Sequence, residues 1–425
     1  MRFLSLILCL AFLQASSQSI DDCRQRLTRY LDFNGSLSGQ VLFETKRITI
    51  HFPSQRQALV VNEYDLALLS GFFKQSSPAQ QAAVINAMWS GKWNKRQSDS
   101  LFETLKPRSA APVKESLPLA GRRIAIDPGH FGTSLSEAAV EQKHLHFTTQ
   151  YNGQTDSVKI YESHLTFVTA LLLKKKLEQQ GAEVMLTRQQ ETFTSFGCNF
   201  EQWIKNHRRR VLDSLLKEGD MTPARHAKLI KCSRHAFFWD FFRDYELLNR
   251  VALINKFAPD VAVIIHYNVD EKNTPWKKAS PKNFTMTFMG GALTSADLSK
   301  KGTQMDFLRL LFTDQLNRSE QLCSNTVNAF HSTLQIPIAK SADAEYLLKN
   351  CKSTGRPGVF CRNLALCRRI NAPLVYGEAL YQDNEKECQL LMDEKTGDDG
   401  ILLSGRISSV TSCYYSAILK YFENN

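Results

Sequence analysis

Two histidines and two glutamates stand beside segments of predicted regular structure that are far apart along the chain. His130 follows the turn Asp-Pro-Gly after the apolar segment RRIAID, His266 follows VAVII, and Glu378 follows PLVYG. Glu162 directly precedes a predicted helix. Two histidines and a glutamate can hold a catalytic zinc ion and leave a fourth position for water, while a second carboxylate moves protons. These residue types indicate metal-assisted hydrolysis of an amide.

Each of these residues also has an ordinary structural explanation. His130 could be a turn residue, and His266 could be a hydrogen-bonded histidine at a strand end. The negative charge of Glu162 would stabilise a helix N-terminus by up to about 1 kcal/mol. Glu378 is harder to explain, because a carboxylate after an apolar strand risks burial without a partner. The four residues are far apart and form no short His-x-x-x-His pattern, so their spacing alone decides nothing.

The elements that would position these side chains begin at Arg122, where strands start to alternate with helices. The predicted strands are residues 122–127, 182–188, 260–268 and 372–381, and the predicted helices are residues 163–180 and 246–257. This order predicts an α/β fold with a mainly parallel sheet flanked by helices. Sites in such sheets form beyond the carboxyl ends of the strands. His130, His266 and Glu378 should therefore meet at one edge of the sheet.

A hairpin is predicted over residues 143–162, because Asn152-Gly153 is a strong signal for a tight turn between two strands. His144 and His146 lie in this segment and His164 lies just after it. These three histidines are rival candidates for metal ligands.

A long insertion is predicted over residues 189–244, which are helical in pattern and rich in Lys and Arg. It is either an elaboration of the surface or a lid or regulator over the metal site. Its basic side chains could bind an anionic polymer of the cell wall, although a solvated basic face explains them as well.

The 425-residue chain has a net charge of +11, which favours contact with an anionic polymer such as nucleic acid, an anionic membrane or a cell wall. Residues 1–17 have the pattern of a secretory signal peptide, with cleavage before Gln18. We expect an accessory domain of unknown role at 18–105, a Pro- and Ser-rich linker at 106–120, and the α/β domain at 121–425. No later segment is apolar enough to span a membrane, so the mature protein should be exported and soluble.

Four segments carry the candidate residues in a fixed order: IAIDPGHFG, YESHLTFVTALLLKKKLEQQGAEVMLTR, NRVALINKFAPDVAVIIHYN and APLVYGEALYQDNEKECQLL. Together they resemble the zinc-dependent N-acetylmuramoyl-L-alanine amidases of the Amidase_3 family. The residues that match the family pattern are Asp127, Gly129, His130, Glu162, Thr187, Arg188, Arg250, Asn255, His266, Asn268, Glu378 and Asn384. Phe131 departs from it, because a second glycine is usual there, and we expect it to make the lip of the site bulkier.

The resemblance implies that His130, Glu162 and His266 bind one Zn²⁺, that Glu378 is the catalytic carboxylate and that Asn268 binds substrate. It implies cleavage of the amide between N-acetylmuramic acid and L-alanine in peptidoglycan, in the periplasm or outside the cell. We therefore expect peptidoglycan as the partner and no nucleic acid, and the sequence leaves open whether an activator or regulator acts on the site. Two alternatives stay open: a zinc hydrolase of another exported amide or peptide, and a non-catalytic protein that binds or regulates the cell wall.

Overall fold

The computed structural model describes residues 18–76, 78–90, 92–104, 117–132, 134–151, 154–273, 276–396, 400 and 402–424. Three of the sequence predictions concern residues that lie wholly or mostly outside these ranges. The predicted signal peptide, residues 106–116 of the predicted linker and the Asn152-Gly153 turn lie outside the described residues.

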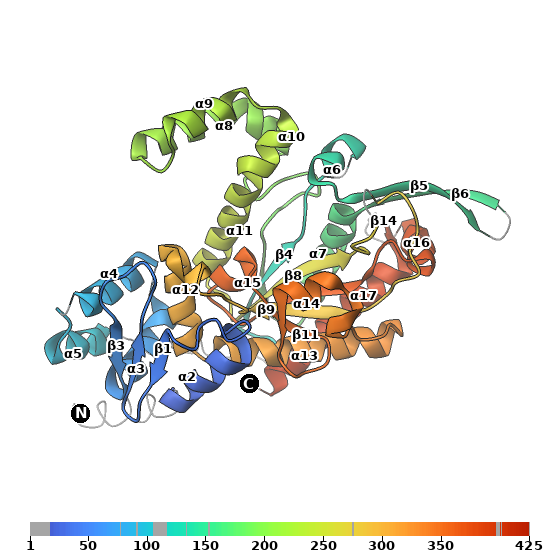
Figure 1. Cartoon of the computed structure of the whole chain (residues 1–425). Helices are drawn as coiled ribbons and strands as arrows, with labels where there is room; N and C mark the ends of the chain where they lie inside the picture. Colours follow the sequence, from blue (N-terminus) through green and yellow to red (C-terminus); the bar gives the residue numbers. More distant parts are fainter. Residues whose placement is uncertain are drawn as a thin grey trace.

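A seven-stranded sheet forms the centre of the molecule (Figure 1). Its strands in spatial order are β10 (Cys351–Ser353), β11 (Val359–Arg362), β9 (Met286–Gly290), β12 (Leu374–Tyr381), β8 (Val261–Asn268), β4 (Arg123–Pro128) and β7 (Glu183–Leu186). The pairs β7–β4, β4–β8, β8–β12 and β9–β11 are parallel, whereas β12–β9 and β11–β10 are antiparallel. The predicted fold class, an α/β fold with a mainly parallel sheet, is confirmed.

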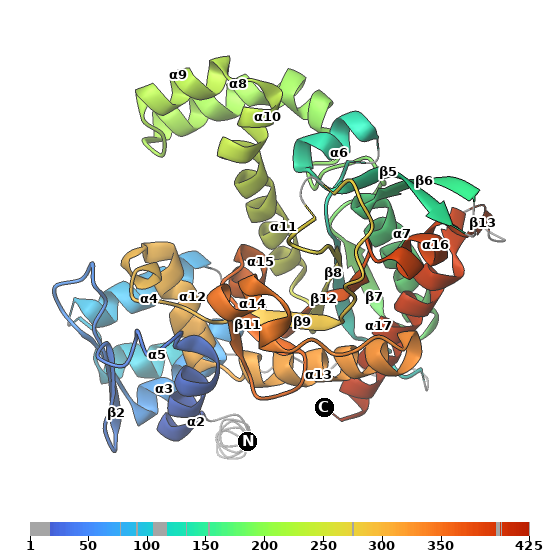
Figure 2. The same cartoon turned by 45° about the vertical axis from the view of Figure 1, so that its right-hand side comes forward.

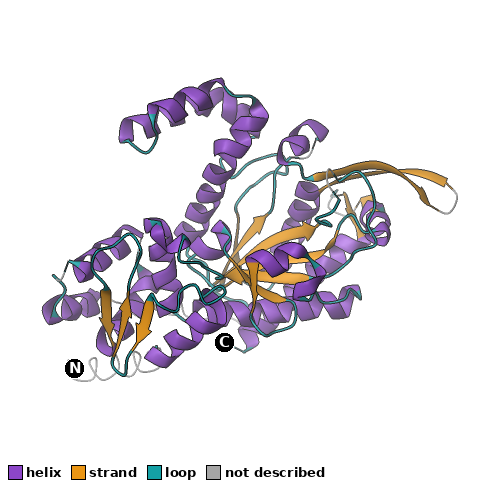
Figure 3. Ribbon diagram, viewed as in Figure 1, coloured by secondary structure: helices purple, strands orange, loops and turns teal. Residues whose placement is uncertain are grey.

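Helices cover both faces of this sheet (Figure 3). One layer consists of α7 (Glu162–Gln179), α13 (Gln315–Leu334) and α17 (Gly405–Glu423), and the other contains α11 (Arg243–Phe257), α14 (Glu345–Asn350) and α15 (Ala365–Arg369). Val263 of β8 packs with the first layer and its neighbour Ile264 packs with the second. Because alternate side chains of a strand point to opposite faces, a strand covered on both sides is apolar throughout.

The N-terminal region packs against the end of the sheet domain that holds α12 (Lys301–Phe312), on the left of Figure 1. Its elements are α2 (Ile20–Arg26), η1 (Leu27–Leu31), β1 (Val41–Phe43), β2 (Arg47–Ile50), β3 (Leu59–Asn62), α3 (Glu63–Gln75), α4 (Pro78–Trp89) and α5 (Lys95–Thr104). The backbone N–H of Ala292 donates to the carbonyl of Tyr30 at 2.8 Å, and Nε of Arg26 donates to that of Leu311 at 2.8 Å. The two regions share one apolar core.

The predicted hairpin is confirmed as β5 (His144–Tyr151) paired antiparallel with β6 (Gln154–Tyr161). The predicted insertion contains α8 (Phe200–Glu218), α9 (Pro223–Lys231), α10 (Arg234–Phe237) and the π-helical turn η2 (Phe238–Phe242), which runs on into α11. Figures 1 and 2 place α8 and α9 beyond the far end of α11, away from the sheet.

The remaining elements are short. They are α6 (Leu135–Glu141), η3 (Asp297–Ser299), η4 (Ser341–Asp343), α16 (Glu385–Met392), β13 (Glu394–Thr396) and β14 (Leu402–Ser404). None of the helices in the described ranges has the length and apolar character needed to cross a membrane. The nine cysteines in these ranges are all free thiols.

Candidate metal centre

His130, Glu162 and His266 come together although they belong to three separate elements. His130 follows β4, Glu162 is the first residue of α7, and His266 lies in β8. Their potential ligand atoms all lie within 4.8 Å of one another. Glu162 Oε1 lies 3.3 Å from Nε2 of His130 and 2.9 Å from Nδ1 of His266. Two imidazoles and a carboxylate at this separation can hold a divalent metal ion. These three residues are called the metal group below.

The Asp-Pro-Gly-His turn brings His130 into this group. Any side chain at position 129 would overlap the imidazole ring of His266, so only glycine fits beneath that ring. His130 itself has a φ of 59°. This left-handed conformation costs a residue with a side chain about 1–2 kcal/mol. The turn therefore places the two rings close together at the cost of an unfavourable backbone conformation at His130.

Two buried arginines hold the turn in place. Nη2 of Arg188 donates to the carbonyl of Gly129 at 3.3 Å, and Nη1 of Arg250 donates to that of Pro128 at 2.9 Å. Arg250 also forms an ion pair with Asp127 at 3.2 Å. Breaking a buried pair of this kind costs about 3–5 kcal/mol, because one charge is left without compensation.

Glu141, at the end of α6, belongs to the site although no feature of the sequence predicted it. Its Oε1 lies 3.4 Å from Nδ1 of His130, and its Oε2 accepts hydrogen bonds at 3.0 Å from the backbone N–H groups of Phe131 and Gly132. A carboxylate that fixes the far nitrogen of a histidine is a common companion of metal sites. No motif marks Glu141, since it is one of two glutamates in a short helix.

The polar atoms of the group fit a zinc ion. Nε2 of His130 and Oε2 of Glu162 are buried and have no hydrogen-bond partner among the described residues. A buried polar atom without a partner is costly, and coordination of a metal ion would remove that cost. Two nitrogen donors and one oxygen donor make up a donor set that is usual for catalytic zinc.

The protonation states of the three side chains are coupled through Glu162. Although burial opposes it, the charge of His130 holds the pKa of Glu162 well below its usual value. Burial likewise acts against protonation of His130, but the charge of Glu162 and the hydrogen bond that His130 donates to Glu141 raise its pKa to about 9. Burial lowers the pKa of His266 to about 4. Glu162 and His266 are thus already in the forms that bind a metal ion.

Glu378 faces the same cavity from β12. Its backbone lies opposite His266 of the parallel strand β8, and its Oε2 is buried without a hydrogen-bond partner in the described part of the chain. Burial and then the negative charge of Glu162 raise the pKa of Glu378 to about 8. The strand predicted over residues 372–381 is confirmed as β12, which continues past Glu378 to Tyr381 with an irregular register. The cavity has a volume of about 520 Å³.

The other candidates from the sequence take different positions. Asn268 lines the cavity, but its Nδ2 donates to the hydroxyl of Tyr346 at 2.9 Å. His164 lies outside the group, because its two ring nitrogens bond to Glu191 at 2.8 Å and to Glu394 at 3.0 Å. His144 and His146 lie on β5 and are not in the group either.

The model of the family Amidase_3, described as N-acetylmuramoyl-L-alanine amidase, matches residues 124–399, which is more than half of the chain. This chain belongs to the Amidase_3 family. The matched range contains the three clustered residues and Glu378.

Individual proteins are similar to this chain either over a short segment or at low sequence identity. YrvJ of Bacillus subtilis (strain 168), whose name assigns it provisionally to the N-acetylmuramoyl-L-alanine amidases, is 32% identical over 103 residues, which is 24% of this chain and 17% of YrvJ. "Probable cell wall amidase LytH" of Staphylococcus aureus is 34% identical over 83 residues, 20% of this chain and 23% of LytH. The chain therefore spans less than a quarter of the length of these curated relatives. The solved structure of the CwlD amidase from Clostridioides difficile in complex with the GerS lipoprotein is 16% identical with a TM-score of 0.38, and the match covers 72% of this chain and 100% of that chain.

Phe131 stands where the Amidase_3 pattern has its second glycine, and its ring is buried in the helical insertion. The ring centroid lies 5.9 Å from that of Phe200, 6.0 Å from that of Phe238 and 6.1 Å from that of Phe242. Only 2% of Phe131 is exposed. Phe131 does line the cavity, as the sequence predicted, and its ring also anchors the insertion beside the metal group of this Amidase_3 protein.

The insertion also contributes to the wall of the cavity. Phe238 and Trp239 of η2, together with Arg243 at the start of α11, line the cavity. The outer helices α8 and α9 do not line it. The inner end of the insertion in this Amidase_3 protein is thus part of the site, and its outer end is not.

Proposed function

We propose that this protein is an exported, zinc-dependent N-acetylmuramoyl-L-alanine amidase, which hydrolyses the amide between N-acetylmuramic acid and L-alanine in peptidoglycan. One observation carries the proposal. Three potential metal ligands converge beside a buried, unbonded carboxyl group in the part of the chain that the Amidase_3 model matches. His130, Glu162 and His266 would hold the zinc ion.

When bound, zinc supplies a Lewis acid that polarises the amide carbonyl and makes a water molecule more acidic. Glu378 takes up the proton of the attacking water and returns it to the leaving amine. A pKa of about 8 supports this role, because a group that titrates near neutral pH can both accept and donate a proton.

The neighbours of these residues act by positioning them. Glu141 holds the ring of His130 through its far nitrogen, and Arg250 holds the backbone of the turn at Pro128. Asn268 would contact substrate at the cavity wall, with its amide group held by Tyr346.

Export fits this substrate, since peptidoglycan lies outside the cytoplasmic membrane. The pattern of residues 1–17 and the net charge of +11 support export and contact with an anionic wall. We favour the periplasm as the compartment. A regulator acting on the insertion is compatible with this assignment.

Metal analysis combined with digestion of purified sacculi tests the proposal. The mature protein should contain one zinc ion per chain and release stem peptides, and a chelator should stop the release. Glu378→Ala should retain the zinc ion and lose turnover. Full activity of Glu378→Ala, or a wild-type protein that binds no zinc, would refute the assignment.

A second candidate is a zinc hydrolase that acts on another exported amide or peptide. It is favoured by the cavity wall that η2 contributes, because such additions set specificity. Mass spectrometry of the products separates the two candidates. A non-catalytic protein that binds or regulates the wall would instead pull down sacculi without cleaving them.

A further inference from the structure

Arg362, the last residue of β11, lines the same cavity as Glu378. It is half-buried, and its guanidinium lies over the rings of Phe288 at 5.2 Å and Tyr346 at 5.0 Å. Within the described ranges, no hydrogen bond or ion pair of this guanidinium is found. The aromatic rings fix the plane of the group and leave its N–H donors without an acceptor.

The other cationic side chains of the cavity differ from Arg362 because each has an acidic partner. Arg250 bonds to Glu246 at 2.7 Å, Arg243 to Asp244 at 3.0 Å, and Lys143 lies 3.9 Å from Oε2 of Glu162. Among the described residues that line the cavity, Arg362 is therefore the strong cation without an ion pair, although its charge acts to lower the pKa of Glu378.

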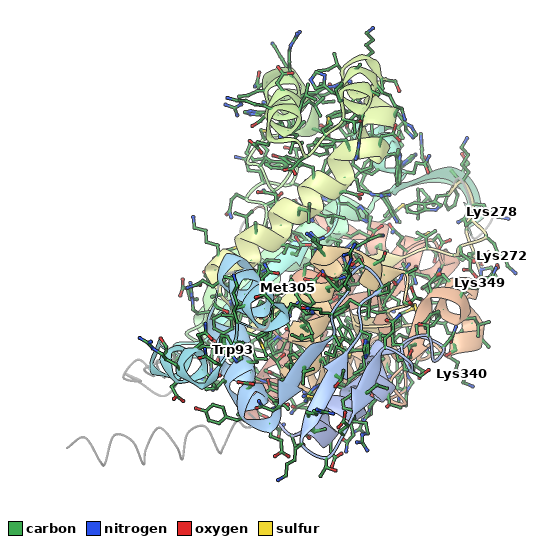
Figure 4. The ribbon with its side chains drawn as sticks, turned by 60° about the vertical axis from the view of Figure 1, so that its left-hand side comes forward. Trp93, Lys272, Lys278, Met305, Lys340 and Lys349 are labelled. Carbon is green, nitrogen blue, oxygen red and sulfur yellow. The ribbon has the colours of Figure 1, made fainter. Side chains whose placement is uncertain are left out.

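Arg362 also differs from the lysines on the outside of the molecule. Lys272, Lys278, Lys340 and Lys349 are exposed and project from one side of the structure (Figure 4). Such charges are well solvated and contribute little to specific binding. The half-buried guanidinium of Arg362 has already lost part of its water, so an anion that replaces this water gains more.

We propose that Arg362 is a specificity residue that binds a carboxylate of the substrate's peptide part. The planar fork of a guanidinium matches a carboxylate with two parallel hydrogen bonds. This inference rests on the proposed function, in which the substrate is an N-acylmuramyl peptide. The lactyl carboxyl of N-acetylmuramic acid is consumed in the scissile amide, so the carboxylates that remain belong to the peptide.

In a tetrapeptide with lysine as its third residue, two carboxylates can fill this role: the α-carboxyl of the isoglutamyl residue and the carboxyl at the peptide's C-terminus. Three muramyl tetrapeptides distinguish them: one unmodified, one amidated at the isoglutamyl α-carboxyl, and one amidated at the C-terminus. For the wild-type enzyme, one of the two amidations should lower kcat/KM about 10- to 100-fold, mainly through KM, because hydrogen bonds to charged groups are strong.

Arg362→Gln should cleave the unmodified tetrapeptide about as slowly as the wild type cleaves the amidated tetrapeptide that it disfavours. The variant should cleave these two compounds at the same rate. A merely structural role predicts a different result, namely that Arg362→Gln slows all three compounds equally. That result, or a wild type that cleaves all three alike, would overturn the proposal. Arg356→Gln is a matched control, since Arg356 is 62% exposed and lies outside the cavity.

Calorimetric measurement of the affinity for the free tetrapeptide separates a failure of the proposed function from a failure of the proposed role of Arg362. If the zinc-loaded wild type cleaves none of the compounds, the proposed function fails. Arg362 is then tested by binding alone: the unmodified peptide should bind the wild type about 10-fold or more tightly than it binds Arg362→Gln. Equal binding by the two proteins, with unchanged melting temperatures, would refute the role of Arg362.

Discussion

The metal group and the helical insertion meet at adjacent residues, His130 and Phe131, yet they are built in different ways. The metal group takes single polar side chains from separate elements, and each side chain is fixed by a specific partner. The insertion is held by one cluster of apolar side chains, most of them aromatic. A polar site of this kind fails when one atom is lost, whereas an apolar cluster loses stability in proportion to the volume removed.

Glu141 joins the two regions. One of its oxygens contacts the ring of His130, and the other accepts the backbone N–H of Phe131. The insertion thus holds the side chain that follows a proposed metal ligand, and Glu141 holds the backbone between them. Substitutions on either side of this junction measure how far the two regions depend on each other.

The largest effect is expected for His130→Ala. If His130 is one of three zinc ligands, as proposed, its loss should release the zinc ion, and activity should fall by more than about 10⁴-fold, the upper end of what a single proton-transferring group contributes. Elemental analysis of the purified variant and release of stem peptides from sacculi measure the two effects.

His164→Gln is the matched control for a rival histidine. Its ring nitrogens bond to Glu191 and Glu394 rather than to the metal group. The variant should keep its zinc ion and its turnover. Loss of zinc in His164→Gln, or retention of zinc in His130→Ala, would contradict the assignment of the ligands.

The next effect is expected for Phe131→Ala. Truncation of a buried phenylalanine costs about 3–5 kcal/mol, so the free energy of unfolding in urea should fall by this amount. Phe131→Leu should cost less, because it leaves a smaller cavity. A Phe131→Ala protein with unchanged stability would show that the insertion is not anchored at this point.

The contrast between the two regions also explains what the sequence could predict. The strands β4, β8 and β12 are long apolar runs that end near chemically distinctive residues, so both the sheet and the edge with His130, His266 and Glu378 could be inferred. The strands β9 and β11 have only five and four residues and were missed. β9 pairs with β12 and β11 pairs with β9, through contacts that no local pattern marks.

The role of Phe131 could not be inferred, because aromatic residues spread between positions 131 and 242 form a cluster only after folding. Glu141 was missed for the same reason: its partners are one ring nitrogen and two backbone N–H groups, which leave no sequence signal. A departure from a family pattern, such as Phe131 in place of glycine, was the one available sign of such a junction.

A moderate effect is expected for Glu141→Gln. The amide oxygen can still accept hydrogen bonds from Phe131 and Gly132, but the negative charge beside His130 is lost. Loss of such a partner lowers metal affinity about 10- to 100-fold. Competition with a chromophoric chelator measures the affinity for zinc. Affinity equal to that of the wild type would mean that Glu141 supports the backbone of the turn and not the metal group.

The smallest effect is expected for Arg209→Ala on the outer face of α8. Arg209 is 84% exposed and its ion pair with Asp213 is 3.9 Å long, so removal should change the free energy of unfolding by less than about 0.5 kcal/mol. Turnover of a soluble muramyl peptide should not change, because α8 does not line the cavity. Sacculi provide the sharper comparison, since they are an extended anionic surface that the basic helices α8 and α9 could contact. A defect on sacculi alone would mean that α8 and α9 bind the cell wall, whereas an equal defect on the soluble peptide would mean that the whole insertion contributes to the site.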